Sequence, residues 1–235
     1  MVAALGETTA GPVLPRLLDH MLGSAEGRRI LKERPRINTS TIDMEALARL
    51  PENTFGHTYV TWLERCGVTP DTRDPVSLGA IYVALVLTSI TQVHYIDDPE
   101  LAYVMQRYRE CHDFYHALCG MPVSVEYELA LKVFEFANLG LPSAALSVAA
   151  VVRLNAAKRA RFLSEYVPWA LRCGSAAQSM ITVYWEERWA QDLGELKKEL
   201  GVWDPPPPKW RRPLSEAKEA VARRVQVAEL GGQMS

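Results

Sequence analysis

The chain has 235 residues, 48% of them hydrophobic, and its 26 lysines and arginines nearly balance its 28 aspartates and glutamates. This length and composition predict one globular domain with a single substantial core, and the balanced charge excludes a general attraction to nucleic acid. The four cysteines form no CxxC pair and no dense framework, which is typical of proteins from a reducing compartment.

The first 75 residues predict small helices joined by turns. Apolar-periodic stretches alternate there with breaks rich in proline, glycine and polar residues. Thr41 and Asp43 stand where a helix cap is expected, just before a periodic run that Pro51 ends. The amino terminus has neither the pattern of a secretory signal nor the several arginines of a mitochondrial transit peptide, so no targeting segment is evident.

The longest apolar run extends from Leu78 to Thr91. It is shorter than the roughly 20 residues that a helix needs to cross a bilayer. We therefore expect no transmembrane span, and any membrane attachment of this chain is expected to be peripheral. The run has the composition of a buried strand or a core helix, which periodicity alone does not separate.

A strong helix signal follows, from Pro99 to about Cys119. Asp98 can accept hydrogen bonds from the free backbone donors of the first turn, and proline suits the first helical position. Gly120 favours the left-handed conformation that ends a helix, and Pro122 cannot continue one. A second helix is expected to start at Pro122 and to end before a Gly-Leu-Pro break at residues 140–142.

The remaining sequence is helical in pattern, and the predicted fold class is all-α, a single mostly helical domain. Four prolines at 205–208 predict a polyproline II spacer. Residues 214–230 predict an amphipathic helix that docks weakly or binds a partner, with a solvated tail as the alternative. We expect a helical domain over residues 1–203 and a proline-rich linker with an amphipathic tail over residues 204–235.

The stretch HDFYHALCGMPVSVEYE, residues 112–128, carries the candidate chemistry. His112 and His116 are one helical turn apart, Asp113 adjoins them, and Glu128 lies in the next helix across a tight turn. Antiparallel packing of the two helices would gather two nitrogens and one or two carboxylate oxygens around a cation, with one position open. The alternative is a pair of packed, hydrogen-bonded histidines with the aspartate facing solvent.

Two familiar metal-site patterns are disfavoured. The spacing is similar to the HExxH helix of zinc proteases, but aspartate is one methylene shorter than the glutamate that such a protease uses. A helical phosphohydrolase with a His-Asp pair needs further histidine and aspartate ligands on other helices, and no other histidine here is followed directly by an aspartate. Arg107 and Arg109 point away from the centre of the apolar stripe and are expected to be solvated helix charges.

Several segments resemble the mitochondrial ubiquinone biosynthesis protein 4 homologue family, and the resemblance extends from residue 1 to about Val202. The HDxxH motif, followed after eleven residues by glutamate, is the specific signature. The other resembling segments are LGETTAGPVL, ERPRINTSTID, PDTRDPV, DDPELAYVMQRYRECHDFYHALCGMP, FEFANLGLP and YWEERWAQDLGELKKELGV.

The resemblance implies a metal-binding protein on the matrix side of the mitochondrial inner membrane, peripheral to it. Carried over by position, the ligands of a divalent ion, with Zn²⁺ expected, are His112, Asp113, His116 and Glu128. The implied activity is removal of the C1 carboxyl from the polyprenylated 4-hydroxybenzoate intermediate of coenzyme Q synthesis, with Asp113 as the candidate catalytic residue. The implied partners are the polyprenylated lipid and the other enzymes of the biosynthetic complex, and a homodimer is compatible.

Two features lead to further expectations. The chain has SLGAIYVALVLTSITQVH, residues 77–94, where the family runs almost directly from DTRDPV into YIDDPELAYV, and we expect this insert to be dispensable. An isoprenoid tail requires an apolar groove, and the alanine-rich residues 141–152 could line it, although core packing explains them as well. The rival to a decarboxylase is a non-catalytic scaffold that holds lipid and enzymes around a structural metal.

Overall fold

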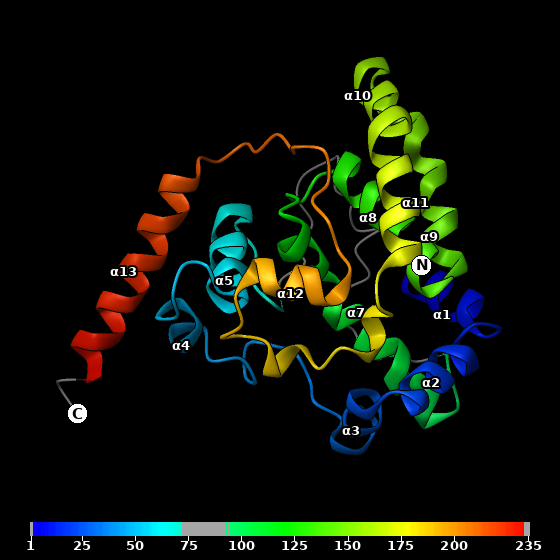
Figure 1. The fold of residues 1–235 in the computed structure, drawn as a ribbon, viewed down its shortest axis with the longest axis horizontal. Coiled ribbons are helices and arrows are strands. Elements are labelled where there is room, and N and C mark those ends of the chain that lie inside the picture. The colour runs from blue at the N-terminus through cyan, green and yellow to red at the C-terminus, as the bar shows by residue number, and fades with distance from the viewer. Residues whose placement is uncertain (1, 72–92, 94, 233–235) are drawn as a thin grey trace.

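The computed structural model describes residues 2–71, 93 and 95–232 (Figure 1). The described residues form helices and connecting loops, and their only β pairing is an isolated bridge between Thr54 and Asp192. This confirms the all-α class. The helices are α1 (Val2–Ala10), α2 (Leu14–Gly23), α3 (Ala25–Glu33), α4 (Met44–Ala48), α5 (Phe55–Cys66), α7 (Pro99–Cys119), α8 (Val125–Leu139), α9 (Pro142–Ser147), α10 (Ala156–Arg161), α11 (Val167–Ala176), α12 (Leu193–Leu200) and α13 (Leu214–Gly232).

Shorter helical segments join the later helices. Three of them are 3₁₀ turns, η1 (Val148–Arg153), η3 (Met180–Thr182) and η4 (Trp185–Glu187), and one is a π turn, η2 (Phe162–Tyr166). Because η2 continues directly from α10 into α11, these three elements form one helical arm. The arm returns along α8, against which α11 packs more extensively than any other pair of elements pack.

Helix α7 is the centre of the molecule (Figure 1). Every residue from Tyr103 to Cys119 is buried, so the helix has no solvent face over that length. One end of α7 packs into a cluster of apolar side chains with α2, and the other end packs into a larger cluster with α5 and α8. Side chains from the middle of α7 therefore project into the interior in every direction.

The predicted limits of α7 are confirmed. Asp98 accepts hydrogen bonds from the backbone N–H groups of Glu100 and Leu101, and Gly120 ends the helix with a positive φ of 63°. The second helix starts at Val125 rather than at Pro122, because Ser124 is in an extended conformation (φ −159°, ψ 156°). The chain uses these residues to reverse direction before α8 begins.

The amino-terminal third contains the small helices that were expected. Asp43 caps α4 by accepting from the N–H of Ala46 at 2.9 Å. Thr41 is not a cap, because its hydroxyl donates to the carbonyl of Arg36 at 2.7 Å. The insert predicted at residues 77–94 lies outside the described residues apart from Val93, so its dispensability stays a prediction. Within the described part of the chain, no helix is both long enough and apolar enough to span a membrane.

The carboxy-terminal helix α13 packs against α4 and α5. Ala217 and Val221 are buried at this contact, so α13 is docked on the body and is not a solvated tail. The proline run before it touches the body as well, because Pro205 is buried and the N–H of Lys209 donates to the hydroxyl of Tyr127 at 2.6 Å. The domain boundary at residue 203 stays a prediction.

The expectation that Arg107 and Arg109 are solvated is wrong. Both side chains are fully buried. Arg109 pairs with Glu7 of α1 at 2.8 Å, and Arg107 donates to Glu186 at 2.8 Å and to the carbonyl of Val183 at 3.2 Å. A buried guanidinium is tolerated only where carboxylates and carbonyls replace its water, and the partners come from both ends of the chain.

Candidate metal centre

Two histidines and a glutamate meet between α7 and α8. His112 and His116 lie one turn apart near the end of α7, and Glu128 lies in the first turn of α8. The Gly120 turn folds α8 back so that these three side chains face one another. All three are buried, with exposed fractions of 2%, 0% and 1%. The structure thus brings together three of the four residues that the sequence analysis named as ligands.

The distances among their polar atoms suit a small cation. The Nε2 atoms of the two histidines are 3.2 Å apart, Nε2 of His112 is 3.2 Å from Oε2 of Glu128, and Nε2 of His116 is 3.0 Å from Oε1 of Glu128. Ligand atoms about 2.0–2.1 Å from a tetrahedral zinc ion stand about 3.3 Å from one another. Three protein atoms at this spacing leave the fourth coordination position for water or substrate.

The other ring nitrogens are held by acceptors. Nδ1 of His112 faces Oε1 of Glu135, and Nδ1 of His116 lies 3.2 Å from the carbonyl oxygen of Met121. Each Nδ1 must carry the proton in order to donate to its acceptor, so a neutral ring presents the lone pair of Nε2 to the centre. The Gly120 turn supplies the second acceptor, because it returns the chain to His116 through a 2.9 Å bond from the N–H of Met121 to the carbonyl of His116.

The residues present fit a divalent ion. With both Nδ1 atoms protonated, the centre contains two nitrogen lone pairs and a carboxylate, all of them acceptors. Oε1 of Glu128 is buried and makes no hydrogen bond of acceptable geometry within the described part of the chain, although Nε2 of His116 lies nearby. Buried acceptors that face one another repel unless a cation or a proton lies between them. The group can therefore hold a metal ion.

The charges of the site reinforce one another. Burial alone disfavours the ionised form of each group. The carboxylates of Glu135 and Glu128 nevertheless raise the pKa of His112, against burial and the positive charge of Lys132. Likewise, the two imidazoles hold the pKa of Glu128 well below its usual range in spite of burial. The carboxylate that would bind a cation is thus ionised at neutral pH.

Asp113 is placed differently from the other three. It is buried at the edge of the site but is not part of the group formed by His112, His116 and Glu128. Its helical position turns it toward α5. There burial raises the pKa of the Cys66 thiol to about 12, and the charges of Asp113 and Glu128 add to this rise. Asp113 is therefore not exposed to solvent. This excludes the alternative in which the two histidines are merely packed and the aspartate faces solvent.

Three further residues complete the surroundings of His112, and the sequence analysis missed them. Glu135 accepts a hydrogen bond from the hydroxyl of Tyr108 and pairs with Lys132, each at 2.6 Å. Burial opposes ionisation of Glu135, yet Lys132 and His112 lower its pKa to about 2. Helical spacing could have identified these residues, because Glu135 lies two turns after Glu128 and Tyr108 lies one turn before His112.

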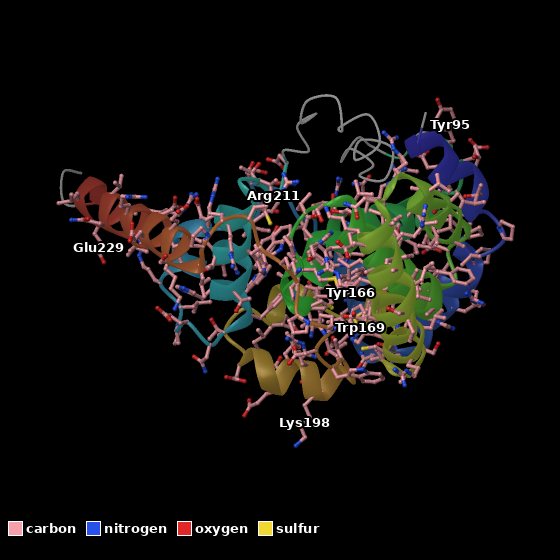
Figure 2. The ribbon with its side chains drawn as sticks, turned by 90° about the horizontal axis from the view of Figure 1, so that it is seen from above. Tyr95, Tyr166, Trp169, Lys198, Arg211 and Glu229 are labelled. Atoms are coloured by element: carbon pink, nitrogen blue, oxygen red, sulfur yellow. The ribbon has the colours of Figure 1, made fainter. Side chains whose placement is uncertain are left out.

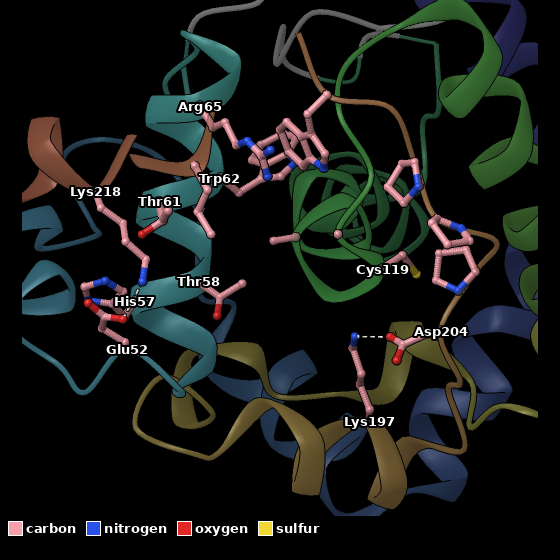
Figure 3. A pocket seen from close by; sticks show the side chains of 17 residues that line it. Glu52, His57, Thr58, Thr61, Trp62, Arg65, Cys119, Lys197, Asp204 and Lys218 are labelled. Carbon is pink, nitrogen blue, oxygen red and sulfur yellow. Dashed lines mark hydrogen bonds and ion pairs between the residues drawn. The ribbon is translucent and has the colours of Figure 1, made fainter. Parts of the chain in front are cut away.

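A pocket lies behind one wall of the centre (Figure 3). The ring of Trp62 on α5 is 5.4 Å from that of His116, and its Nε1–H donates to the carbonyl of Met121 at 2.7 Å. The other face of this wall opens into a cavity of about 590 Å³ between α5, the end of α7, α12 and the carboxy-terminal segment. Residues 141–152, which were expected to line an apolar groove, are not part of this lining.

The fold and the site define the class of this protein: a helical protein in which two histidines and a glutamate, buried between consecutive helices, could hold a metal ion. The family described as coenzyme Q (ubiquinone) biosynthesis protein Coq4 matches residues 1–83 and 86–206. This chain belongs to that family, whose proteins take part in ubiquinone biosynthesis. The match includes most of the proposed insert and leaves out only its residues 84 and 85.

Curated relatives agree with this assignment. The protein named "Ubiquinone biosynthesis protein COQ4, mitochondrial" from Laccaria bicolor is 63% identical over 224 residues, which are 95% of this chain and 70% of that protein. The one so named from Coprinopsis cinerea is 60% identical over 230 residues, 97% of this chain and 73% of that protein. The crystal structure of a Nostoc punctiforme protein provisionally named for ubiquinone biosynthesis has a TM-score of 0.56, with 81% of each chain covered. At 19% identity, it shows the fold alone.

Proposed function

We propose that this protein removes the C1 carboxyl group from the polyprenylated 4-hydroxybenzoate intermediate (4-hydroxy-3-methoxy-5-polyprenylbenzoate) in coenzyme Q biosynthesis. The observation that carries the proposal is the convergence of Nε2 of His112, Nε2 of His116 and the Glu128 carboxylate on one point, with both Nδ1 atoms held by acceptors. These three residues would hold a divalent ion, expected to be Zn²⁺. When bound, the ion supplies a Lewis acid for a carboxylate or phenolate oxygen of the substrate.

The reaction requires one proton. The bond between C1 and the carboxyl carbon breaks, carbon dioxide leaves, and the electron pair that remains on C1 is taken up by a proton. We assign the handling of that proton to Asp113, which is buried beside the centre and is not one of its three converging groups. With an ion bound, Nε2 of His112 and Nε2 of His116 would be ligands, so neither ring would offer a proton within the centre.

The pocket behind Trp62 suits the apolar part of such a substrate. Its walls include Trp62, Trp210 and prolines of the 205–208 run, and they also include Ala117, the residue after His116. An isoprenoid chain in this space would lie one side chain away from the metal centre. We therefore place the tail of the substrate here and its carboxylated ring at the centre.

A scaffold with a structural metal is the second candidate. The observation that favours it is the burial of all three converging residues, none of which is more than 2% exposed. Under either function we place the protein at the matrix side of the mitochondrial inner membrane, peripheral to it. There it would act with the other enzymes of the coenzyme Q biosynthetic complex and help to organise that complex.

A turnover experiment separates the two candidates. Purified protein is loaded with Zn²⁺ and mixed with the prenylated acid in detergent, and the carbon dioxide released is measured. We expect release in the parent, little in Glu128→Gln, and little in Asp113→Asn although that variant keeps its metal. Absence of release from metal-loaded, folded parent would reject the decarboxylase and leave the scaffold.

A further inference from the structure

The arm formed by α10, η2 and α11, together with α9 and η1, makes a helical hairpin whose turn lies at residues 154–155. The end that carries α10 projects beyond the neighbouring helices (Figure 1). Large apolar side chains are exposed along this hairpin: Leu146 by 52%, Val152 by 74%, Leu163 by 54% and Leu171 by 43%. Exposed apolar side chains are ordinary when they are scattered, but a series of them on one projecting element indicates an interaction surface.

Apolar residues recur at helical spacing along the exposed side of the arm. Ala160, Leu163, Val167 and Leu171 follow one another at intervals of three or four residues, which is the period of a helical stripe. Phe162, Tyr166 and Trp169 are buried on the opposite side, toward the core. The arm thus has two apolar stripes, of which one packs against the core and the other is exposed to solvent.

The hairpin that carries this outer face is rich in basic residues. Between Pro142 and Ala176 the chain has five basic residues and a single acidic one, Glu165. Arg161 is bound to Glu126 of the body at 2.7 Å. Lys158 and Arg159 are exposed on α10, and neither forms an ion pair with any described residue. The surface therefore combines exposed Leu and Val side chains with cations that point into solvent.

We propose that this face, defined by Leu146, Val152, Leu163 and Leu171 with Lys158 and Arg159, docks on an anionic lipid surface. Exposed apolar side chains on a projecting element can enter the interfacial region of a bilayer, and nearby cations can bind phosphate headgroups there. Charge complementarity decides between occupants. A second copy of this chain would bring the same basic face against itself, whereas anionic lipid offers the opposite charge.

The proposal rests on the proposed function, since a polyprenylated substrate is held in a membrane. No helix in the described part of the chain could span a membrane, so this part would reach the substrate from the surface. The proposal goes beyond that function by naming the face. Figure 2 shows Glu229 of α13 at one end of the molecule, far from Tyr166 and Trp169 of the hairpin, which lie nearer the middle. Helix α13 carries Val227 and Leu230, exposed by 69% and 57%, and therefore provides a matched control.

Vesicle flotation of the purified full chain tests the proposal. The vesicles are phosphatidylcholine alone or an equimolar mixture of phosphatidylcholine and phosphatidylglycerol. The parent is expected to float with the anionic vesicles and much less with the neutral ones. The double variant V152E/L163E should bind anionic vesicles at least about tenfold more weakly, because two apolar side chains that would enter the bilayer are lost. The double variant K158E/R159E should lose about fivefold or more for each cation.

The control variant V227E/L230E on α13 should float like the parent. Zinc content, measured in every variant, should be unchanged, which shows that the folded centre is intact. Equal flotation of the parent and V152E/L163E would overturn the proposal, and so would an equal loss in the α13 control. Sedimentation of a dimeric parent and a monomeric V152E/L163E would show instead that the face joins two copies. No turnover is measured, so failure of the decarboxylase proposal does not affect this result.

Discussion

Along α7 every residue from Tyr103 to Cys119 is buried, charged ones included, whereas the α9–α11 hairpin exposes Leu146, Val152 and Leu163 to solvent. Both regions depart from the usual distribution of side chains, in opposite directions. In α7 each buried arginine has a carboxylate partner, so the departure is compensated within the molecule. In the hairpin nothing among the described residues covers the apolar face. Buried charges with partners inside the molecule thus indicate a structural or functional site. Exposed apolar side chains that no described residue covers indicate a surface that binds another molecule or a membrane.

The largest expected effect is on metal content. His116→Ala removes one of the three converging donors, and two donors do not hold a divalent ion firmly. Metal analysis of the purified protein should fall from about one equivalent per chain to a small fraction of that. His57→Ala is the matched control, because His57 lies on α5 with its Nδ1 3.2 Å from the carbonyl of Ala48, outside the centre. Equal metal content in His116→Ala and in the parent would remove the assignment of the site.

The next largest effect is on stability and tests the pairing of buried charges in α7. Arg109→Met leaves the Glu7 carboxylate buried without its cation, which costs about 3–5 kcal/mol in the free energy of unfolding. Chemical denaturation measures the change. The exposed pair of Arg29 and Glu187 provides the control, since Arg29→Met should unfold close to the parent. If the two variants lost similar amounts of unfolding free energy, burial of the ion pair in α7 would not determine the loss.

A smaller effect on metal affinity is expected from Glu135, which contacts the proposed ligand His112. Glu135→Gln weakens the hydrogen bond that orients His112, and a change of this kind lowers metal affinity about 10–100-fold. Competition with a chelator measures the affinity. Glu126→Gln is the control, because Glu126 is equally buried on α8 but binds Arg161 and not a histidine. If the two variants bound zinc equally well, Glu135 would have no role in positioning His112.

The smallest effect concerns the charge of a helix-capping carboxylate at the surface. Asp192 caps α12, and the N–H of Glu195, with Asn53 and the N–H of Gly194, lowers the pKa of its carboxyl below 3.8. A pKa that is lower in the folded state gives stability that is complete above about pH 3.8 and is lost as the pH falls through the folded value. Asp192→Asn should therefore be slightly less stable than the parent at neutral pH. The difference should disappear in acid, as thermal melts at a series of pH values would record; a difference that persists would show that the charge is not its source.

Much of the metal centre could be predicted from the sequence, because its main determinants are local. Asp98 and Gly120 define the ends of α7 through hydrogen bonds to backbone groups within a few residues, and Pro99 suits the first helical position. One-turn spacing then places His112 and His116 on one face, and the tight turn brings Glu128 back to them. The all-α class follows from the same local patterns of capping and periodicity.

Only the tertiary structure decided which polar residues are inside. Arg107 and Arg109 have the sequence pattern of solvated helix charges, and they are buried because Glu186 and Glu7 reach them from distant parts of the chain. The docking of α13 on α5 and the pocket behind Trp62 likewise depend on segments far apart in the sequence. A periodic pattern reports which face of a helix is apolar, but it holds no information about a partner beyond the next few turns. Burial of a charge is decided by that partner, and so it is settled only when the chain has packed.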